Sequence, residues 1–152
     1  MQRRIFVCHA FLFLAANGCS EKSGGPPLVP AEGTVTLDGK PLADASVMFI
    51  PSGETMGQAG MGKSDASGRF VIAKVDDRRP GAAVGGYRVV ISKKVNPDGT
   101  VFQPRPDQDP MTAAYKELLP PVYCDEAQSR LTAEVPVGGV KSLEFKLDSK
   151  AK

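Results

Sequence analysis

The sequence predicts an all-β protein, an antiparallel Greek-key sandwich of about seven short strands. Three observations lead to this fold class. Apolar and polar residues alternate with a period of two through most of the chain, and turn-forming residues interrupt these runs at short intervals. Glycine and proline number 16 and 13 in 152 residues, which favours turns and short strands over long helices. Evenly spaced short strands without helical crossovers are typical of a sandwich.

The first eighteen residues have the pattern of an export signal. Arg3 and Arg4 precede an apolar run at residues 5–16. This run is shorter than the roughly 20 residues that a membrane-spanning helix needs, and it matches the apolar region of a signal peptide. A buried N-terminal helix of the domain is the alternative. We therefore expect residues 1–18 to be a signal peptide.

The run ends in Ala16-Asn17-Gly18-Cys19. This tetrapeptide resembles the lipobox of bacterial lipoproteins, although Ala16 stands where that family usually has leucine. The resemblance implies that residues 1–18 are a lipoprotein signal peptide and that Cys19 is lipidated and becomes the first residue of the mature chain. The lipid would anchor the protein in the cell envelope, to a bacterial membrane, with the domain facing the periplasm or the outside. The competing interpretation is ordinary cleavage near Ala15 or Ala16, which would leave a soluble secreted protein.

Residues 19–30 are predicted to be a flexible tether. They are rich in serine, glycine, proline and charged residues and have little to bury. The eleven residues after Cys19 reach at most about 35 Å, so the domain would lie close to the membrane.

The domain predicted at residues 31–148 begins with four candidate strands, at residues 33–37, 46–50, 58–64 and 69–73. Asp38-Gly39 is a hairpin-type turn signal, and residues 65–68 suit a type I turn. The glycine-rich segment 58–64 is the weakest of the four. The residues expected on the inner face are Val35, Leu37, Val47, Phe49, Phe70 and Ile72.

Three further strands are predicted in the second half, at residues 87–95, 131–135 and 143–147, before a tail at residues 149–152. Their alternation has the same period of two. The residues expected on the inner face are Tyr87, Val89, Ile91, Leu131, Ala133, Val135, Leu143, Phe145 and Leu147.

The segment at residues 96–118 breaks the alternation and contains four prolines. Loops longer than about 15 residues are usually functional or disordered. Asp109-Pro110 suits the start of a short helix running to Leu118. The candidate ligand-binding residues in and near this loop are Phe102, Asp107, Asp109, Tyr115 and Tyr123.

Five motifs combine turn residues with alternating core residues. They are Gly33-x-Val35-x-x-Asp38-Gly39-Lys40-Pro41-Leu42-Ala43-x-Ala45-x-Val47-x-Phe49, Ser64-Asp65-x-x-Gly68-x-Phe70, Gly85-x-Tyr87-x-Val89, Pro121-x-Tyr123 and Ser129-x-Leu131-Thr132-x-x-Val135. Together they resemble carboxypeptidase regulatory-like domains, which are transthyretin-like β-sandwiches. The resemblance covers nearly all of residues 29–148 and implies a fold and no active site. In larger proteins such domains act as folding or positioning modules, and small exported bacterial lipoproteins carry one alone.

The composition argues against enzymatic chemistry and against a bound cofactor or metal. The one histidine, His9, lies in the predicted signal peptide, so serine or cysteine nucleophiles would lack their usual base, and zinc its usual ligands. Cys124 is expected to be a half-buried thiol. Asp98 and its neighbours in the long loop lack the spacing of a calcium loop. The pattern Gly57-x-x-x-x-Gly62-Lys63-Ser64 matches a phosphate loop only in its letters, because a hairpin surrounds it.

Charge argues against nucleic acid as a partner, since residues 19–152 carry 17 basic and 17 acidic side chains. The sequence therefore predicts a membrane-anchored envelope lipoprotein with a non-catalytic sandwich in a structural or protein-interaction role, possible partners being envelope proteins or glycans. The alternative is a carbohydrate- or peptide-binding module that uses the loop at residues 96–118. Two exposed aromatic side chains and a carboxylate on one concave face would favour the alternative.

Overall fold

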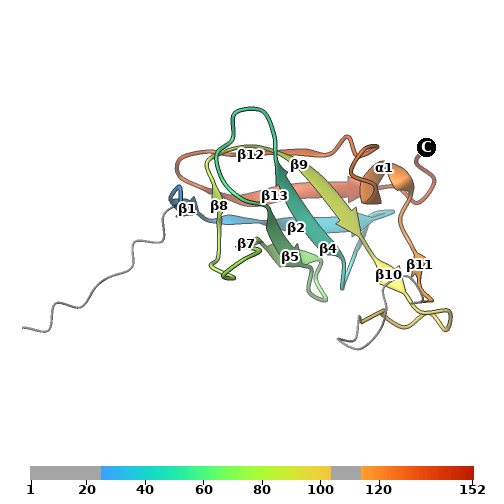
Figure 1. Cartoon of the computed structure of the whole chain (residues 1–152). Coiled ribbons are helices and arrows are strands. Elements are labelled where there is room, and N and C mark those ends of the chain that lie inside the picture. Colours follow the sequence, from blue (N-terminus) through green and yellow to red (C-terminus); the bar gives the residue numbers. More distant parts are fainter. Residues whose placement is uncertain (1–24, 104–113) are drawn as a thin grey trace, which may run out of the picture.

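A computed structural model describes residues 25–103 and 114–152, and these residues form an all-β sandwich (Figure 1). The larger sheet has five strands that are all antiparallel to their neighbours. In spatial order they are β12 (Thr132–Val135), β9 (Gly85–Ser92), β4 (Ser46–Pro51), β5 (Gly60–Lys63) and β7 (Ala73–Lys74).

The smaller sheet is built around β2, which has β13 on one edge and both β3 and β6 on the other. Its pair β13–β2 is parallel, whereas every other strand pair in the described residues is antiparallel as predicted. The chain reaches β13 from β12 of the other sheet, so no hairpin constrains its direction. The strands are β2 (Ala31–Leu37), β3 (Lys40–Pro41), β6 (Arg69–Val71) and β13 (Val140–Leu147).

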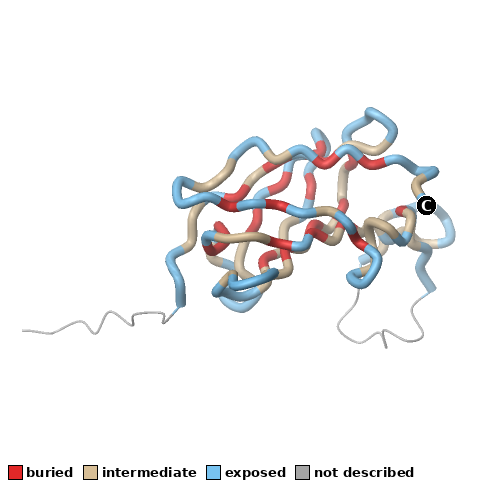
Figure 2. The backbone as a smooth tube through the Cα atoms, turned by 90° about the horizontal axis from the view of Figure 1, so that it is seen from above, coloured by how far each residue is buried: buried red, intermediate tan, exposed pale blue. Residues whose placement is uncertain are grey.

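Two short strand pairs mark the opposite ends of the sandwich. At one end β1 (Leu28–Val29) pairs with β8 (Ala82–Ala83), and at the other β10 (Lys94–Val95) pairs with β11 (Lys116–Glu117). Both views place these pairs far apart (Figures 1 and 2). We call the β1–β8 end basal, because the described chain starts there, and the β10–β11 end distal.

The core confirms the predicted alternation. Phe49 lies at its centre, with ring centroids 5.5 Å from Tyr87 and 6.3 Å from Phe70. Buried and exposed residues alternate along the strands (Figure 2). Fifteen inner-face residues were expected, and the twelve that are buried are Val35, Val47, Phe49, Phe70, Ile72, Tyr87, Val89, Ile91, Ala133, Val135, Phe145 and Leu147. The other three, Leu37, Leu131 and Leu143, pack against that core while partly exposed.

Several predicted boundaries change in the structure. The predicted strand at residues 87–95 is divided, because β9 ends at Ser92 and residues 94–95 form β10, which pairs with β11. The predicted strand at residues 69–73 is two strands, because the chain leaves β2 after Val71 and joins β5 at Ala73. The domain also begins before residue 31, since Leu28 pairs with Ala83 and Val29 packs against the core. Residues 25–30 of the predicted tether are therefore partly built into the fold. The predicted signal peptide, Cys19 and the tether up to residue 24 lie outside the described residues.

The short helix predicted from Asp109 to Leu118 is wrong for its second half. Residues 116–117 form β11, and the carboxylate of Glu117 accepts hydrogen bonds from the end of β9. These tertiary bonds outweigh the local capping signal, and residues 109–113 lie outside the described part. The helical turn that does form is α1 (Pro121–Cys124), with proline in its first turn. Within the described residues, no helix has the length and apolar character needed to cross a bilayer.

Candidate functional site

The distal end carries a group of aromatic and cationic side chains that we call the distal cluster: Lys94, Phe102 and Tyr115. The rings of Phe102 and Tyr115 lie with centroids 5.0 Å apart, and the Lys94 Nζ lies 4.4 Å from the centroid of the Tyr115 ring. An ammonium at this distance from an aromatic face is attracted by the ring quadrupole. Tyr115 keeps 41% of its surface exposed, so the cluster offers an aromatic surface to solvent.

Glu117 fastens the distal cluster to the sandwich. Its carboxylate accepts hydrogen bonds from the Ser92 hydroxyl at 2.6 Å, from the Lys93 amide at 2.8 Å and from the Leu119 amide at 3.1 Å. Hydrogen bonds to a carboxylate are stronger than those between neutral groups. One side chain therefore holds β11, and with it Tyr115, against the end of β9.

A turn at residues 96–100 positions the other ring. The Asn96 amide donates to the Thr100 carbonyl at 2.8 Å, and the Asp98 carboxylate accepts from the Thr100 hydroxyl at 2.6 Å. These bonds to Thr100, the hydroxyl first and the amide second, lower the pKa of Asp98. The Phe102 amide then donates to the Lys94 carbonyl at 3.0 Å, which brings Phe102 alongside Tyr115.

The structure places the predicted ligand residues in different positions. Phe102 and Tyr115 are brought together. Tyr123 lies apart from them on α1, where it packs against the core and its hydroxyl accepts a hydrogen bond from the Asp148 amide at 3.2 Å. Asp107 and Asp109 lie outside the described residues.

Cys124 is half-buried, as expected. Its Sγ lies 3.5 Å from the Leu119 carbonyl oxygen, to which the thiol donates. Burial first, and the charge of Glu117 second, raise the pKa of this thiol. The thiolate is the reactive form of cysteine, so this environment opposes nucleophilic chemistry.

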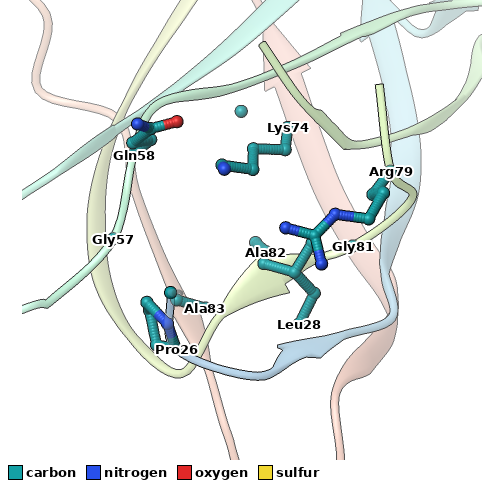
Figure 3. A pocket seen from close by; sticks show the side chains of 11 residues that line it. Pro26, Leu28, Gly57, Gln58, Lys74, Arg79, Gly81, Ala82 and Ala83 are labelled. Carbon is teal, nitrogen blue, oxygen red and sulfur yellow. The ribbon is translucent and has the colours of Figure 1, made fainter. Parts of the chain in front are cut away.

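The basal end has a hollow of about 240 Å³ that we call the basal hollow (Figure 3). The side chains of Lys74 and Arg79 extend into it from β7 and the following loop, and Gln58 lies at its rim (Figure 3). Its remaining wall is apolar or glycine. The lining residues are Gly25, Pro26, Leu28, Gly57, Gln58, Gly60, Lys74, Arg79, Gly81, Ala82 and Ala83.

The two cations of the basal hollow differ in how they are held. The Arg79 Nε donates to the Asp77 carboxylate at 2.7 Å. The hydrogen bond from the Arg79 amide is the first cause that lowers the pKa of Asp77. The Lys74 side chain is only 19% exposed, yet its Nζ lies 3.4 Å from Asp76 and 3.8 Å from Asp77. Both distances exceed the usual length of a hydrogen bond, about 2.7–3.2 Å.

The residues that match the phosphate-loop pattern do not form a phosphate-binding loop. Residues 60–63 are strand β5. The Lys63 Nζ pairs with Asp44 at 2.8 Å, and the Ser64 hydroxyl donates to the Leu42 carbonyl at 2.6 Å. The hairpin context inferred from the sequence is confirmed.

Sequence reasoning missed the residues that organise both ends. None of Lys74, Arg79, Lys94 and Glu117 was among the predicted site residues. Glu117 carries no distinctive signal, since another charged residue, Lys116, precedes it. The cations of the hollow carry none. They lie together because the Lys74 amide donates to the Arg79 carbonyl at 2.8 Å across a short turn, and the docking of β1 against β8 completes the wall around them.

Within the described residues, no three histidine, cysteine or acidic side chains gather closely enough to hold a metal ion. Comparison of the chain with protein-family models, with curated proteins and with solved structures finds no match. Function must therefore be inferred from the two ends themselves.

Proposed function

We propose that this chain is a bacterial envelope lipoprotein, anchored to a membrane through lipid on Cys19, whose β-sandwich is a non-catalytic interaction domain. The observation that carries the proposal is the position of the two ends of the domain relative to Cys19. The described chain starts at the basal end, six residues after Cys19, and the exposed distal cluster lies at the other end (Figure 1). A chain anchored at Cys19 would hold its basal end near the membrane and present the distal cluster to partners.

The shortage of histidine and the environment of Cys124 support a binding role over catalysis. The chain has one histidine, His9, and it lies in the segment that export would remove. The Cys124 thiol is protected by burial and by its neighbours. The resemblance to carboxypeptidase regulatory-like domains agrees with a positioning or interaction role, although fold alone does not assign function.

The anchor is tested by the intact mass of the protein recovered from the native host. We expect a membrane fraction with the mass of residues 19–152 plus lipid chains. The Cys19→Ala chain should lose both the lipid and the membrane association, whereas Cys124→Ala, the matched control, should keep both. Recovery of unlipidated protein from the soluble extracellular fraction would overturn the anchor.

A second candidate function is recognition of carbohydrate or peptide by the distal cluster. The neighbouring, tilted rings of Phe102 and Tyr115, with Lys94 over the Tyr115 ring, favour it, because sugars and extended peptides bind to exposed aromatic side chains. Glycan and peptide arrays would identify a ligand. Tyr115→Ala should then weaken binding about tenfold, the effect of losing roughly 1.4 kcal/mol. Val137→Ala removes an exposed apolar side chain of a turn and should leave binding unchanged.

A further inference from the structure

The basal hollow has the features of a site for a small anion. Two cationic side chains and the amide of Gln58 face a space of about 240 Å³ (Figure 3). Sites for drug-sized ligands usually measure about 300–1,000 Å³, so this space suits a smaller group. Its floor is apolar, formed by Leu28, Ala82 and neighbouring residues. The ligand would therefore combine a compact anion with a short apolar or neutral portion.

Lys74 gives the clearest indication of a ligand. Holding an ammonium in a side chain that is only 19% exposed costs solvation. Its two carboxylate neighbours, at 3.4 Å and 3.8 Å, are too distant for short charge-assisted hydrogen bonds. An anion seated in the hollow would accept such a bond from Lys74 and would also contact Arg79, whose side chain lines the same space.

The two cations suit an anion that has several accepting oxygens. Arginine presents several N–H donors in a plane and is suited to phosphate as well as carboxylate, while lysine acts as a point charge. Phosphate esters offer three or two accepting oxygens to such a pair. Asp76 and Asp77 oppose the binding of any anion here, so the site is a weak one that needs a high local concentration.

The position of the hollow supplies that concentration if the chain is lipidated. Gly25 lines the hollow and stands six residues after Cys19. Six residues span at most about 20 Å when extended. An anchored domain therefore keeps its basal end within reach of lipid headgroups, and tethering raises the effective concentration of a weak ligand to the millimolar range.

We propose that the basal hollow, through Lys74 and Arg79, binds a phosphate ester. The favoured source is the headgroup of an anionic phospholipid, which would hold the domain down on the membrane. A soluble phosphate ester is the other source of the same chemistry. The membrane argument rests on the proposed lipid anchor, but the anion site itself does not.

The test uses the full chain with Cys19→Ala, so that no attached lipid can mediate binding. Its affinity is measured for vesicles of phosphatidylglycerol with phosphatidylcholine and for phosphatidylcholine alone, and the ratio of the two affinities is the readout. Arg3, Arg4 and the apolar run at residues 5–16 are present in every variant, so their contribution cancels when the ratios of the variants are compared. In parallel, glycerol phosphate is titrated while the amide resonances of Gln58 and Gly81 are followed by NMR.

Two variants probe the site, and one serves as the control. Lys74→Gln with Arg79→Gln should lower the preference for anionic vesicles about tenfold. Gln58→Glu places a carboxylate at the exposed rim, where folding is not at risk, and should lower it as well. Lys116→Gln with Lys146→Gln removes the same charge from exposed positions on β11 and β13 and should change the ratio less than twofold.

Each outcome decides the proposal. A selective loss of vesicle preference supports a headgroup site. Saturable binding of glycerol phosphate that the Lys74/Arg79 variant abolishes, with vesicle preference unchanged, supports a site for soluble phosphate esters. Equal losses in the site and control variants, or no binding in either assay, overturn the proposal. Because Cys19 is absent throughout, these results are independent of whether the native chain carries lipid.

Discussion

The two ends of the sandwich hold their functional side chains by different means. At the distal end, one carboxylate, that of Glu117, accepts three hydrogen bonds and fastens a projecting pair of two-residue strands. At the basal end, glycines allow close contact between segments that lie far apart in the sequence. Damage at the distal end should therefore stay local, while damage at the basal end should cost global stability.

The largest expected effect is a difference in unfolding free energy between alanine substitutions at two glycines that both have positive φ. Gly81 has φ +109°, and a Cβ there would lie 2.6 Å from the Val29 carbonyl oxygen. Gly99 has φ +85° with nothing within 4 Å. Gly81→Ala should cost about 2–4 kcal/mol of unfolding free energy, from strain plus overpacking, and Gly99→Ala about 1 kcal/mol from strain alone. Urea unfolding measures both, and equal losses would remove the contrast between the ends.

Glu117→Gln tests the distal fastening. The amide keeps one accepting oxygen and loses the charge, so we expect a loss of about 1–2 kcal/mol. Hydrogen exchange should accelerate at Lys93 and Leu119 and stay unchanged at Ala82 and Ala83. Glu144→Gln, which removes an exposed carboxylate paired with Lys146, is the control and should alter neither region. Faster exchange at β8 would show that the two ends are coupled.

Tyr87→Phe tests a hydrogen bond that supports the floor of the basal hollow. The buried Tyr87 hydroxyl donates to the Ala83 carbonyl at 2.8 Å, and burial raises the pKa of this phenol. Its removal should cost about 1 kcal/mol. Tyr123→Phe removes a hydroxyl that accepts a longer bond, 3.2 Å, in an exposed setting, and should cost less. Thermal unfolding compares them, and a larger loss for Tyr123→Phe would contradict the ranking.

The smallest effect is a pH dependence shared by the ends. The pKa of Asp77 at the basal end and of Asp98 at the distal end are both lowered by hydrogen bonds to the charged form. A folded-state pKa below the unfolded value contributes stability that is present above about pH 4 and is lost as the pH falls through the folded value. Carboxyl NMR titrations should give midpoints below the ordinary range for both. A midpoint within the ordinary range of aspartate for either carboxyl would contradict this prediction.

Much of the fold was predictable because it depends on a local property. An inward residue must recur every second position along a strand, and the predicted inner faces from Val35 to Leu147 are buried or packed against the core. The strand at residues 69–73 was predicted as one element because alternation continues through Ile72. Alternation does not report which sheet each half joins.

The candidate sites were less predictable, because they depend on contacts between segments that lie far apart in the sequence. Phe102 and Tyr115 were chosen as exposed aromatic residues in one long loop, and the structure joins them. Lys94 completes their cluster from another strand. In the basal hollow, Lys74 and Leu28 are neighbours only because β1 docks against β8 beside β7, and no local pattern encodes that approach.

The sequence by itself determined the all-β class, the inner faces of the strands, and the shortage of histidine that argues against most catalysis, because composition and a period of two are properties of the chain alone. Only the tertiary structure decided the parallel pairing of β13 with β2, the division of residues 69–73 between two sheets, and the two ends with their charged side chains. These features depend on which strand edges meet, and that choice is made by packing between residues distant in the sequence.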